Sequence, residues 1–226
     1  MSTERRRRTV EIAYDQLGPG FGEWTAKIQG EPLDRFLSEL CDRLPQGGRI
    51  LDLGCGDGTK LKQLTERFDV LGVDLSGEQL RLARMAAPDA TYIRADFLEL
   101  DFPAASFQAV TAFYSFMHIP RDDHSALLNR IHGWLVPGGL FLAPMSTLGG
   151  PNRVENWLGV DMFFSGWDAG TNARLVREAG FELLVDEVIP MQEPESEYET
   201  DFLWVLARRP SEPVDPDPRR SRPQLL

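Results

Sequence analysis

The sequence predicts an α/β fold in one domain, with a doubly wound, mostly parallel sheet covered by helices. Strand and helix patterns alternate from about residue 30 to residue 190. A short apolar strand at residues 49–53 runs into alternating glycines over residues 54–58. Two carboxylates, Asp74 and Asp96, follow the next two predicted strands at the points where those strands end. These observations are typical of an open α/β sheet.

Periodicity and turn residues define the elements in order. Apolar residues recur at helical spacing over residues 32–44, and Pro45 with the glycines after it ends that helix. Ser76 precedes Gln79 by three residues, the spacing of a capping box, which predicts that a helix begins there. The other predicted elements are strands at 70–73, 91–94, 107–113, 140–145, 181–189 and 201–207, and helices at 57–68, 76–86, 122–135 and 169–179. We expect the last two strands to form an antiparallel hairpin.

Three segments fall outside this alternation. Residues 1–30 are predicted to be an N-terminal arm, and residues 31–208 the folded domain. Residues 147–167 contain a glycine pair at 149–150 followed by several aromatic residues, which predicts an irregular cap inserted after a strand, where such insertions often cover a ligand. Residues 209–226 are rich in proline and arginine without apolar periodicity and are predicted to be disordered.

Composition limits the compartment. No stretch of the 226 residues has the roughly 18 uninterrupted apolar residues of a membrane-spanning helix, and the N-terminus shows no apolar leader segment. Two cysteines, Cys41 and Cys55, are too few for a disulfide framework. We therefore expect a cytoplasmic protein without a membrane partner.

Charge limits the partners. The formal net charge is −11, and because both ends carry extra arginines, the stretch between them is more acidic than the whole. Such a field repels phosphate backbones, which predicts a small-molecule partner and no nucleic acid. The run from Arg5 to Arg8 is interpreted as a solvated tail. The sequence does not indicate an oligomeric state.

The glycine turn from Gly54 to Gly58 is the central signal. Glycine accepts backbone angles that other residues resist and lets a ligand approach the main chain. A dinucleotide-binding turn has the spacing G-x-G-x-x-G, whereas this turn has G-x-G-x-G. The spacing therefore disfavours a nicotinamide cofactor, although an NAD-dependent dehydrogenase stays an alternative.

Two further loops add recognition groups. Asp74 stands at the end of the second strand, where a carboxylate can accept both hydroxyls of an unphosphorylated ribose. Asp96 and Phe97 follow the third strand, where a carboxylate can receive an adenine amino group and a ring can lie against the base. Adenine recognition at this third loop distinguishes proteins that bind S-adenosylmethionine from those that bind a nicotinamide cofactor. It therefore favours S-adenosylmethionine.

These motifs, "LDLGCGDG", "VDLS", "ADF" and "LVPGGLF" over residues 50–145, resemble the class I S-adenosylmethionine-dependent methyltransferases. The resemblance implies a Rossmann-like, seven-stranded sheet in the order 3-2-1-4-5-7-6, with strand 7 antiparallel and helices on both faces. It also implies that Gly54 and Gly56, with Cys55 between them, line the methionine moiety, and that Asp52 holds the amino end of the cofactor. Further implied cofactor contacts come from Tyr14, Asp74, Leu75, Asp96, Phe97, Phe113 and Tyr114.

Methyl transfer mainly requires a nucleophile held close to the methyl carbon, with water excluded. His118 is the best candidate for a general base, since its titration range suits an oxygen or nitrogen nucleophile, although a histidine bonded to backbone is an alternative. His124 and His132 lack a third ligand, so we expect no metal. An apolar or aromatic substrate wall is predicted from Trp24, Met145, Trp157, Phe163, Phe164 and Trp167. A non-catalytic binding module with the same fold stays a further alternative.

Overall fold

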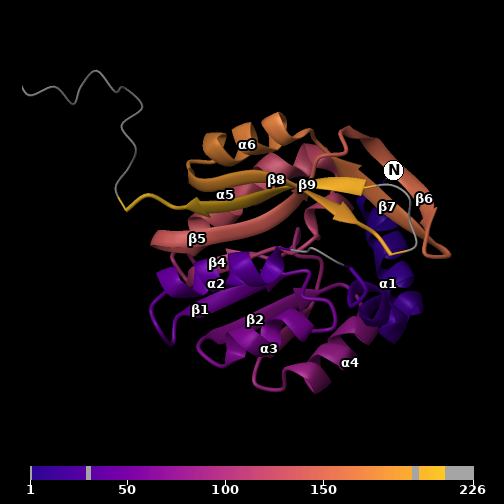
Figure 1. Cartoon of the computed structure of the whole chain (residues 1–226), viewed down its shortest axis with the longest axis horizontal. Coiled ribbons are helices and arrows are strands. Elements are labelled where there is room, and N and C mark those ends of the chain that lie inside the picture. Colours follow the sequence, from indigo (N-terminus) through magenta and orange to yellow (C-terminus); the bar gives the residue numbers. More distant parts are fainter. Residues whose placement is uncertain (1, 29–31, 195–198, 212–226) are drawn as a thin grey trace, which may run out of the picture.

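The computed structural model describes residues 2–28, 32–194 and 199–211 and contains one seven-stranded sheet (Figure 1). The strand order is β3-β2-β1-β4-β5-β9-β8. The strands are β1 Arg49–Leu53, β2 Asp69–Asp74, β3 Thr91–Arg94, β4 Phe107–Thr111, β5 Leu135–Ser146, β8 Glu182–Gln192 and β9 Glu199–Arg208.

The predicted order is confirmed, because β8 and β9 are the sixth and seventh strands of this sheet in chain order. The first five strands pair in parallel, and β9 runs antiparallel to both β5 and β8. β9 therefore lies between β5 and β8, which run parallel to each other. The predicted hairpin of the last two strands is therefore present.

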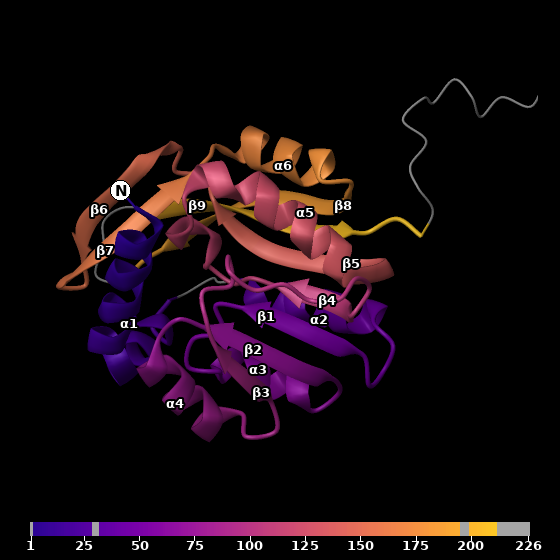
Figure 2. The same cartoon turned by 180° about the vertical axis from the view of Figure 1, so that it is seen from behind.

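Helices cover both faces of the sheet, as predicted (Figures 1 and 2). Side chains of β1 separate accordingly: Ile50 packs into one apolar cluster with α2, α3 and α4, and Leu51 and Leu53 pack into the other with α5 and α6. This alternation follows from the two-residue period of a strand. The helices are α1 Thr3–Thr25, α2 Leu33–Arg43, α3 Thr59–Thr65, α4 Gly77–Ala86, α5 His124–Trp134 and α6 Ala169–Glu178, with short 3₁₀ turns η1 Phe116–His118 and η2 Arg121–Asp123.

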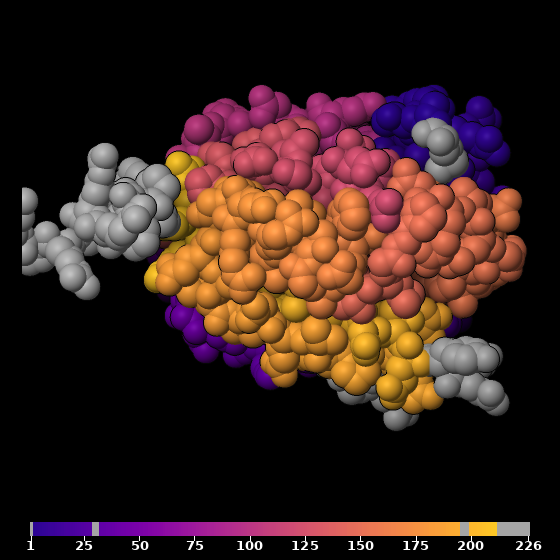
Figure 3. Space-filling model, turned by 90° about the horizontal axis from the view of Figure 1, so that it is seen from above, coloured from indigo at the N-terminus to yellow at the C-terminus, as the bar shows by residue number. Residues whose placement is uncertain are grey.

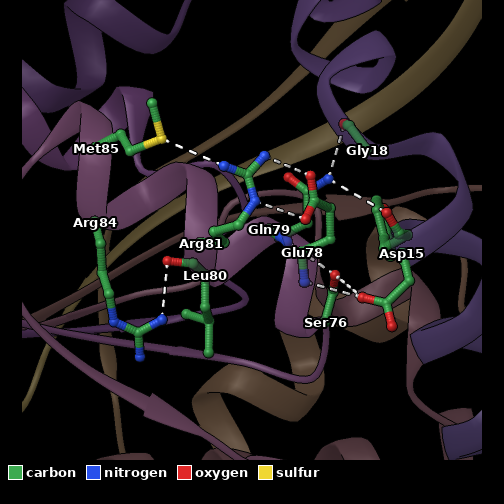
Figure 4. Close-up of polar contacts among 10 residues, drawn as sticks. Asp15, Gly18, Ser76, Glu78, Gln79, Leu80, Arg81, Arg84 and Met85 are labelled. Carbon is green, nitrogen blue, oxygen red and sulfur yellow. Dashed lines mark hydrogen bonds and ion pairs between the residues drawn. The ribbon is translucent and has the colours of Figure 1, made fainter.

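The N-terminal arm is a long helix, α1, broken where Gly18 adopts φ 48° and ψ −135° just before Pro19. Glycine tolerates this left-handed backbone, and proline cannot continue the hydrogen bonding of the preceding turn. The first half of α1 is tied to α4 (Figure 4). The Ser76 hydroxyl donates to Asp15 Oδ1 at 2.5 Å, and Gln79 Nε2 donates to the Gly18 carbonyl at 3.1 Å.

The segment predicted to be an irregular cap is instead a regular hairpin of β6 Gly150–Trp157 and β7 Val160–Gly166. Leu158 and Gly159, which join the two strands, both have positive φ, at 52° and 84°. Two consecutive residues with positive φ form the turn whose twist matches paired strands. The segment therefore forms a hairpin, although its composition is typical of a loop. Figure 3 shows the hairpin adjoining α1 at one end of the molecule.

Of the predicted disordered tail, residues 212–226 lie outside the described residues. Residues 209–211 continue from β9, and the Arg209 side chain donates to the Leu135 carbonyl at 2.5 Å. None of the helices in the described ranges combines the length and the apolar composition that a membrane span requires.

Candidate active site

A cavity of about 450 Å³ lies at the carboxyl ends of the parallel strands, under α1 and the β6–β7 hairpin. Its volume falls within the range of roughly 300–1,000 Å³ that small-molecule sites occupy. Most of the predicted site residues line it, namely Tyr14, Trp24, Gly54, Cys55, Gly56, Asp74, Leu75, Phe97, Phe113, Tyr114, His118, Trp157 and Phe164. Residues from six separate regions of the chain therefore meet at one site.

The three glycines of the turn are required for different reasons. All have positive φ. A Cβ on Gly54 would lie 2.6 Å from Ser115 Cβ, and one on Gly58 would lie 2.8 Å from Ala83 Cα. A Cβ on Gly56 would meet nothing within 4 Å. Packing therefore accounts for Gly54 and Gly58, whereas Gly56 faces open space along the cavity.

Asp74 joins the end of β2 to the glycine turn. Its Oδ2 accepts the Gly56 N–H and its Oδ1 accepts the Ser76 N–H, both at 2.8 Å. A carboxylate retains further acceptor sites after two such bonds. Burial raises the pKa of Asp74 to about 6 even though both backbone donors favour the charged form.

The buried side chains of Asp52 and Cys55 lie at the start of the glycine turn. Asp52 is buried beneath the cavity wall, and its carboxylate accepts the Thr111 hydroxyl at 2.6 Å. Burial raises the pKa of Asp52 to about 6 and raises the pKa of the Cys55 thiol well above its usual value. A thiol that stays protonated is not a nucleophile, so Cys55 serves as a small packed side chain against Gly72.

Asp96 lies outside the cavity wall and is only 2% exposed. Its Oδ1 accepts the Leu98 N–H at 3.0 Å, and its Oδ2 is paired with the guanidinium of Arg6. Arg6 itself lines the cavity, beside Val10 of the same helix.

The interpretation of Arg5 to Arg8 as a solvated tail is wrong for Arg6. The spacing of Arg6, Val10 and Ala13, which share the buried face of α1, was a signal for this helix that sequence reasoning missed.

Tyr14 and His118 form a buried hydrogen-bonded pair. The Tyr14 hydroxyl lies 2.9 Å from His118 Nε2, and His118 Nδ1 lies 2.9 Å from the Phe163 carbonyl oxygen. A carbonyl only accepts, so Nδ1 carries the proton and Nε2 accepts from Tyr14. Burial, with a smaller contribution from the Arg6 charge, lowers the pKa of His118 to about 4. His118 is therefore neutral at physiological pH, and burial raises the pKa of Tyr14.

An aromatic wall closes the cavity between α1 and the hairpin. The ring centroids of Trp24 and Trp157 are 5.3 Å apart, and those of Trp157 and Phe164 are 5.9 Å apart. Phe21, which sequence reasoning missed, stacks on Trp24 with centroids 6.1 Å apart. Phe202 of β9 also lines the cavity. Its place on the wall follows from strand pairing that no local pattern reveals.

Three residues that sequence reasoning placed on the substrate wall do not line the cavity. Met145 is buried within β5, between β4 and β9. Phe163 is buried against α1, because alternation along β7 turns only its neighbour Phe164 toward the cavity. Trp167 is covered by the Arg121 guanidinium, 4.3 Å from its ring centroid.

The fold and this site together define the class of protein, and comparison with known proteins agrees. Residues 50–139 match the family described as "Methyltransferase domain". An uncharacterized methyltransferase of Mycobacterium bovis is 31% identical over 148 residues, which cover 62% of this chain and 71% of that protein. This chain therefore belongs to the class I S-adenosylmethionine-dependent methyltransferases, and S-adenosylmethionine is the cofactor of the class.

Other similarities either cover a smaller part of the two chains or have a lower sequence identity. The trans-aconitate 2-methyltransferase of an Azoarcus species is 36% identical over 116 residues, covering 49% of this chain and 45% of that protein. The chain matches about half the length of the first such relatives. A Burkholderia thailandensis 1,6-didemethyltoxoflavin-N1-methyltransferase, solved with 1,6-didemethyltoxoflavin and S-adenosylhomocysteine, shares the fold with a TM-score of 0.68 at 21% identity over 93% of this chain and 91% of that one.

Proposed function

We propose that this protein transfers a methyl group from S-adenosylmethionine to an oxygen or nitrogen atom of a small-molecule acceptor. One observation carries the proposal: a single cavity joins the glycine turn and Asp74 to a wall of aromatic side chains. The first part suits a nucleoside cofactor, and the second suits an apolar or aromatic acceptor. The Azoarcus relative is likewise named for a small acceptor.

The residues of the turn fit the cofactor. Gly56 leaves open space where a side chain would stand, and Ser115 beside Gly54 is buried with a hydroxyl that has no partner among the described residues. Asp74 would hold the ribose hydroxyls, Leu75 and Phe97 would enclose adenine, and Gly54 and Gly56 would lie along the methionine part. For Asp96 to reach the adenine amino group, its Oδ1 must accept a second hydrogen bond beside that of Leu98.

The cofactor supplies a methyl group on a positively charged sulfur, and the protein supplies position and dryness. His118 is the proposed base, but its Nε2 is already occupied by the Tyr14 hydroxyl. A proton from the acceptor therefore reaches His118 through Tyr14. An oxygen that gains a methyl group before losing its proton becomes strongly acidic, so for an oxygen acceptor a base with a pKa of about 4 suffices.

Calorimetry with S-adenosylhomocysteine and with NAD tests the cofactor half of the proposal. We expect the first to bind and the second not to bind. Release of S-adenosylhomocysteine from S-adenosylmethionine, measured across a panel of phenols, amines and carboxylic acids, tests the acceptor half. Binding without release in any mixture would instead support a non-catalytic module, and preference for NAD would overturn the proposal.

A further inference from the structure

Three cationic side chains line the cavity, and two of them are already paired. Arg6 is held by Asp96, and Arg153 lies 3.1 Å from Glu155 Oε2. Lys60 has no carboxylate within ion-pair distance in the part of the chain that the structure describes. A cation that faces a largely apolar cavity without a paired carboxylate is a binding group for an anion.

Lys60 is held in place by aromatic rings. Its Nζ lies 5.0 Å from the ring centroid of Tyr114 and 5.4 Å from that of Phe113, both in the loop that follows β4. Cation–π contacts at these distances stabilise the ammonium over the rings. Tyr114 has φ 56°, a left-handed backbone that costs free energy in a bulky residue and is commonly found at functional sites. Lys60 is half-buried, at the start of α3 just after the glycine turn.

A polar group without a hydrogen-bond partner in the described ranges lies in the loop after β4. Ser115 follows Tyr114 in the chain, lines the cavity and is 7% exposed, and its Oγ has no hydrogen-bond partner within the described ranges. Tyr14, which the resemblance implied as a cofactor contact, already donates its hydroxyl to His118. Lys60 and Ser115 are therefore two hydrogen-bond donors that face the cavity close to the glycine turn.

We propose that Lys60 binds a carboxylate of the ligand that enters the cavity, an inference that rests on the proposed function. The carboxylate belongs either to the methionine end of the cofactor or to an acidic acceptor. Both sources present the same anion to the ammonium. Charge-assisted hydrogen bonds of this kind change affinity by about 10- to 100-fold.

The Lys60→Met variant separates the two sources, with Lys62→Met, an exposed lysine on the same helix, as its matched control. Calorimetry is performed with S-adenosylhomocysteine and with 5′-methylthioadenosine, which lacks the amino-acid part. If Lys60 binds the cofactor carboxylate, Lys60→Met weakens S-adenosylhomocysteine by about 10-fold or more and leaves 5′-methylthioadenosine unchanged. Lys62→Met changes neither.

If Lys60 instead binds an acidic acceptor, S-adenosylhomocysteine binds both variants as it binds the wild type. Protein loaded with S-adenosylhomocysteine then binds 4-hydroxybenzoate more tightly than 4-hydroxybenzamide, and only Lys60→Met loses this preference. Unchanged affinity for S-adenosylhomocysteine together with no loss of carboxylate preference overturns the inference about Lys60. Failure of the wild type to bind S-adenosylhomocysteine would overturn the proposed function itself.

Discussion

Arg6 shows how one residue in a run of four like charges acquires a distinct role. Its side chain is 3% exposed and that of its partner Asp96 is 1% exposed, whereas the neighbouring Arg5 and Arg8 are exposed. Both members of the pair have lost their hydration, so each depends on the other. The pair also fastens the N-terminal helix to the loop after β3.

Replacing Arg6 by Met should lower the free energy of unfolding by about 3–5 kcal/mol, because it leaves the Asp96 carboxylate buried without its cation. Urea unfolding measures this change. Arg8→Met is the matched control and should have little effect. The double variant Arg6→Met with Asp96→Leu should recover much of the loss, since no charge is then left buried. Equal stability of Arg6→Met and Arg8→Met would show that the pair contributes nothing.

Asp74→Ala should weaken S-adenosylhomocysteine binding by roughly 1–3 kcal/mol if the carboxylate accepts the ribose hydroxyls. Asp69→Ala, at the exposed opposite end of the same strand, is the control and should leave the affinity unchanged. Calorimetry gives both values, and circular dichroism verifies that β2 remains folded. An unchanged affinity in Asp74→Ala would count against the ribose assignment.

At the scale of elements, α1 is the arm that completes the cavity. Its first half packs on α4 and β7, and its second half, beyond Gly18, carries Phe21 and Trp24 onto the aromatic wall. The contacts that hold it are a few polar bonds and a narrow apolar face. Arms held in this way open at lower free energy than central strands do.

Asp15→Ala should loosen α1 selectively. Asp15 Oδ1 accepts both the Ser76 hydroxyl and the Glu78 N–H at 3.1 Å, so its loss removes two bonds between α1 and α4. We expect faster amide exchange over residues 3–25 and a loss of about 1 kcal/mol of stability. Glu23→Ala, an exposed carboxylate on the same helix, is the control. Identical amide exchange in the two variants would show that the Asp15 hydrogen bonds do not hold α1 against α4.

The elements themselves were largely predictable from the sequence. Strands β1 and β3 and the capped start of α4 occur where the patterns predicted them, and the Gln79 N–H donates to the Ser76 hydroxyl at 3.0 Å. These features depend on neighbours within a few residues. The β6–β7 hairpin was misjudged because its turn, Leu158 and Gly159, carries a weaker signal than the common asparagine-glycine pairs.

At the scale of the whole molecule, acid stability depends on buried groups with shifted pKa values. Burial lowers the pKa of His124 to about 4. An unfolded histidine has its ordinary pKa of about 6.5, so below that pH the unfolded chain binds a proton that the folded chain does not. His124 therefore favours folding fully above about pH 6.5, and this contribution is lost as the pH falls toward 4. Asp52 and Asp74, with raised pKa values, act in the opposite direction between about pH 4 and 6.

His124→Gln isolates one of these groups, because the variant and the wild type share all the others. The stability of the wild type relative to the variant should fall by about 2 kcal/mol between about pH 7.5 and about pH 5. Urea unfolding at several pH values measures this difference. A difference that stays constant with pH would show that His124 titrates normally in the folded state.

The sequence by itself determined the class of fold and the position of the glycine turn and Asp74. These follow from local periodicity, turn residues and the shared edge of parallel strands. The strand order was implied only by the resemblance of its motifs to a known family. Only the tertiary structure decided that Arg6 meets Asp96, that Tyr14 occupies His118, and that Lys60 faces the cavity without a paired carboxylate. Such contacts join segments far apart in the chain, and their partners are selected by burial and charge once the elements have packed.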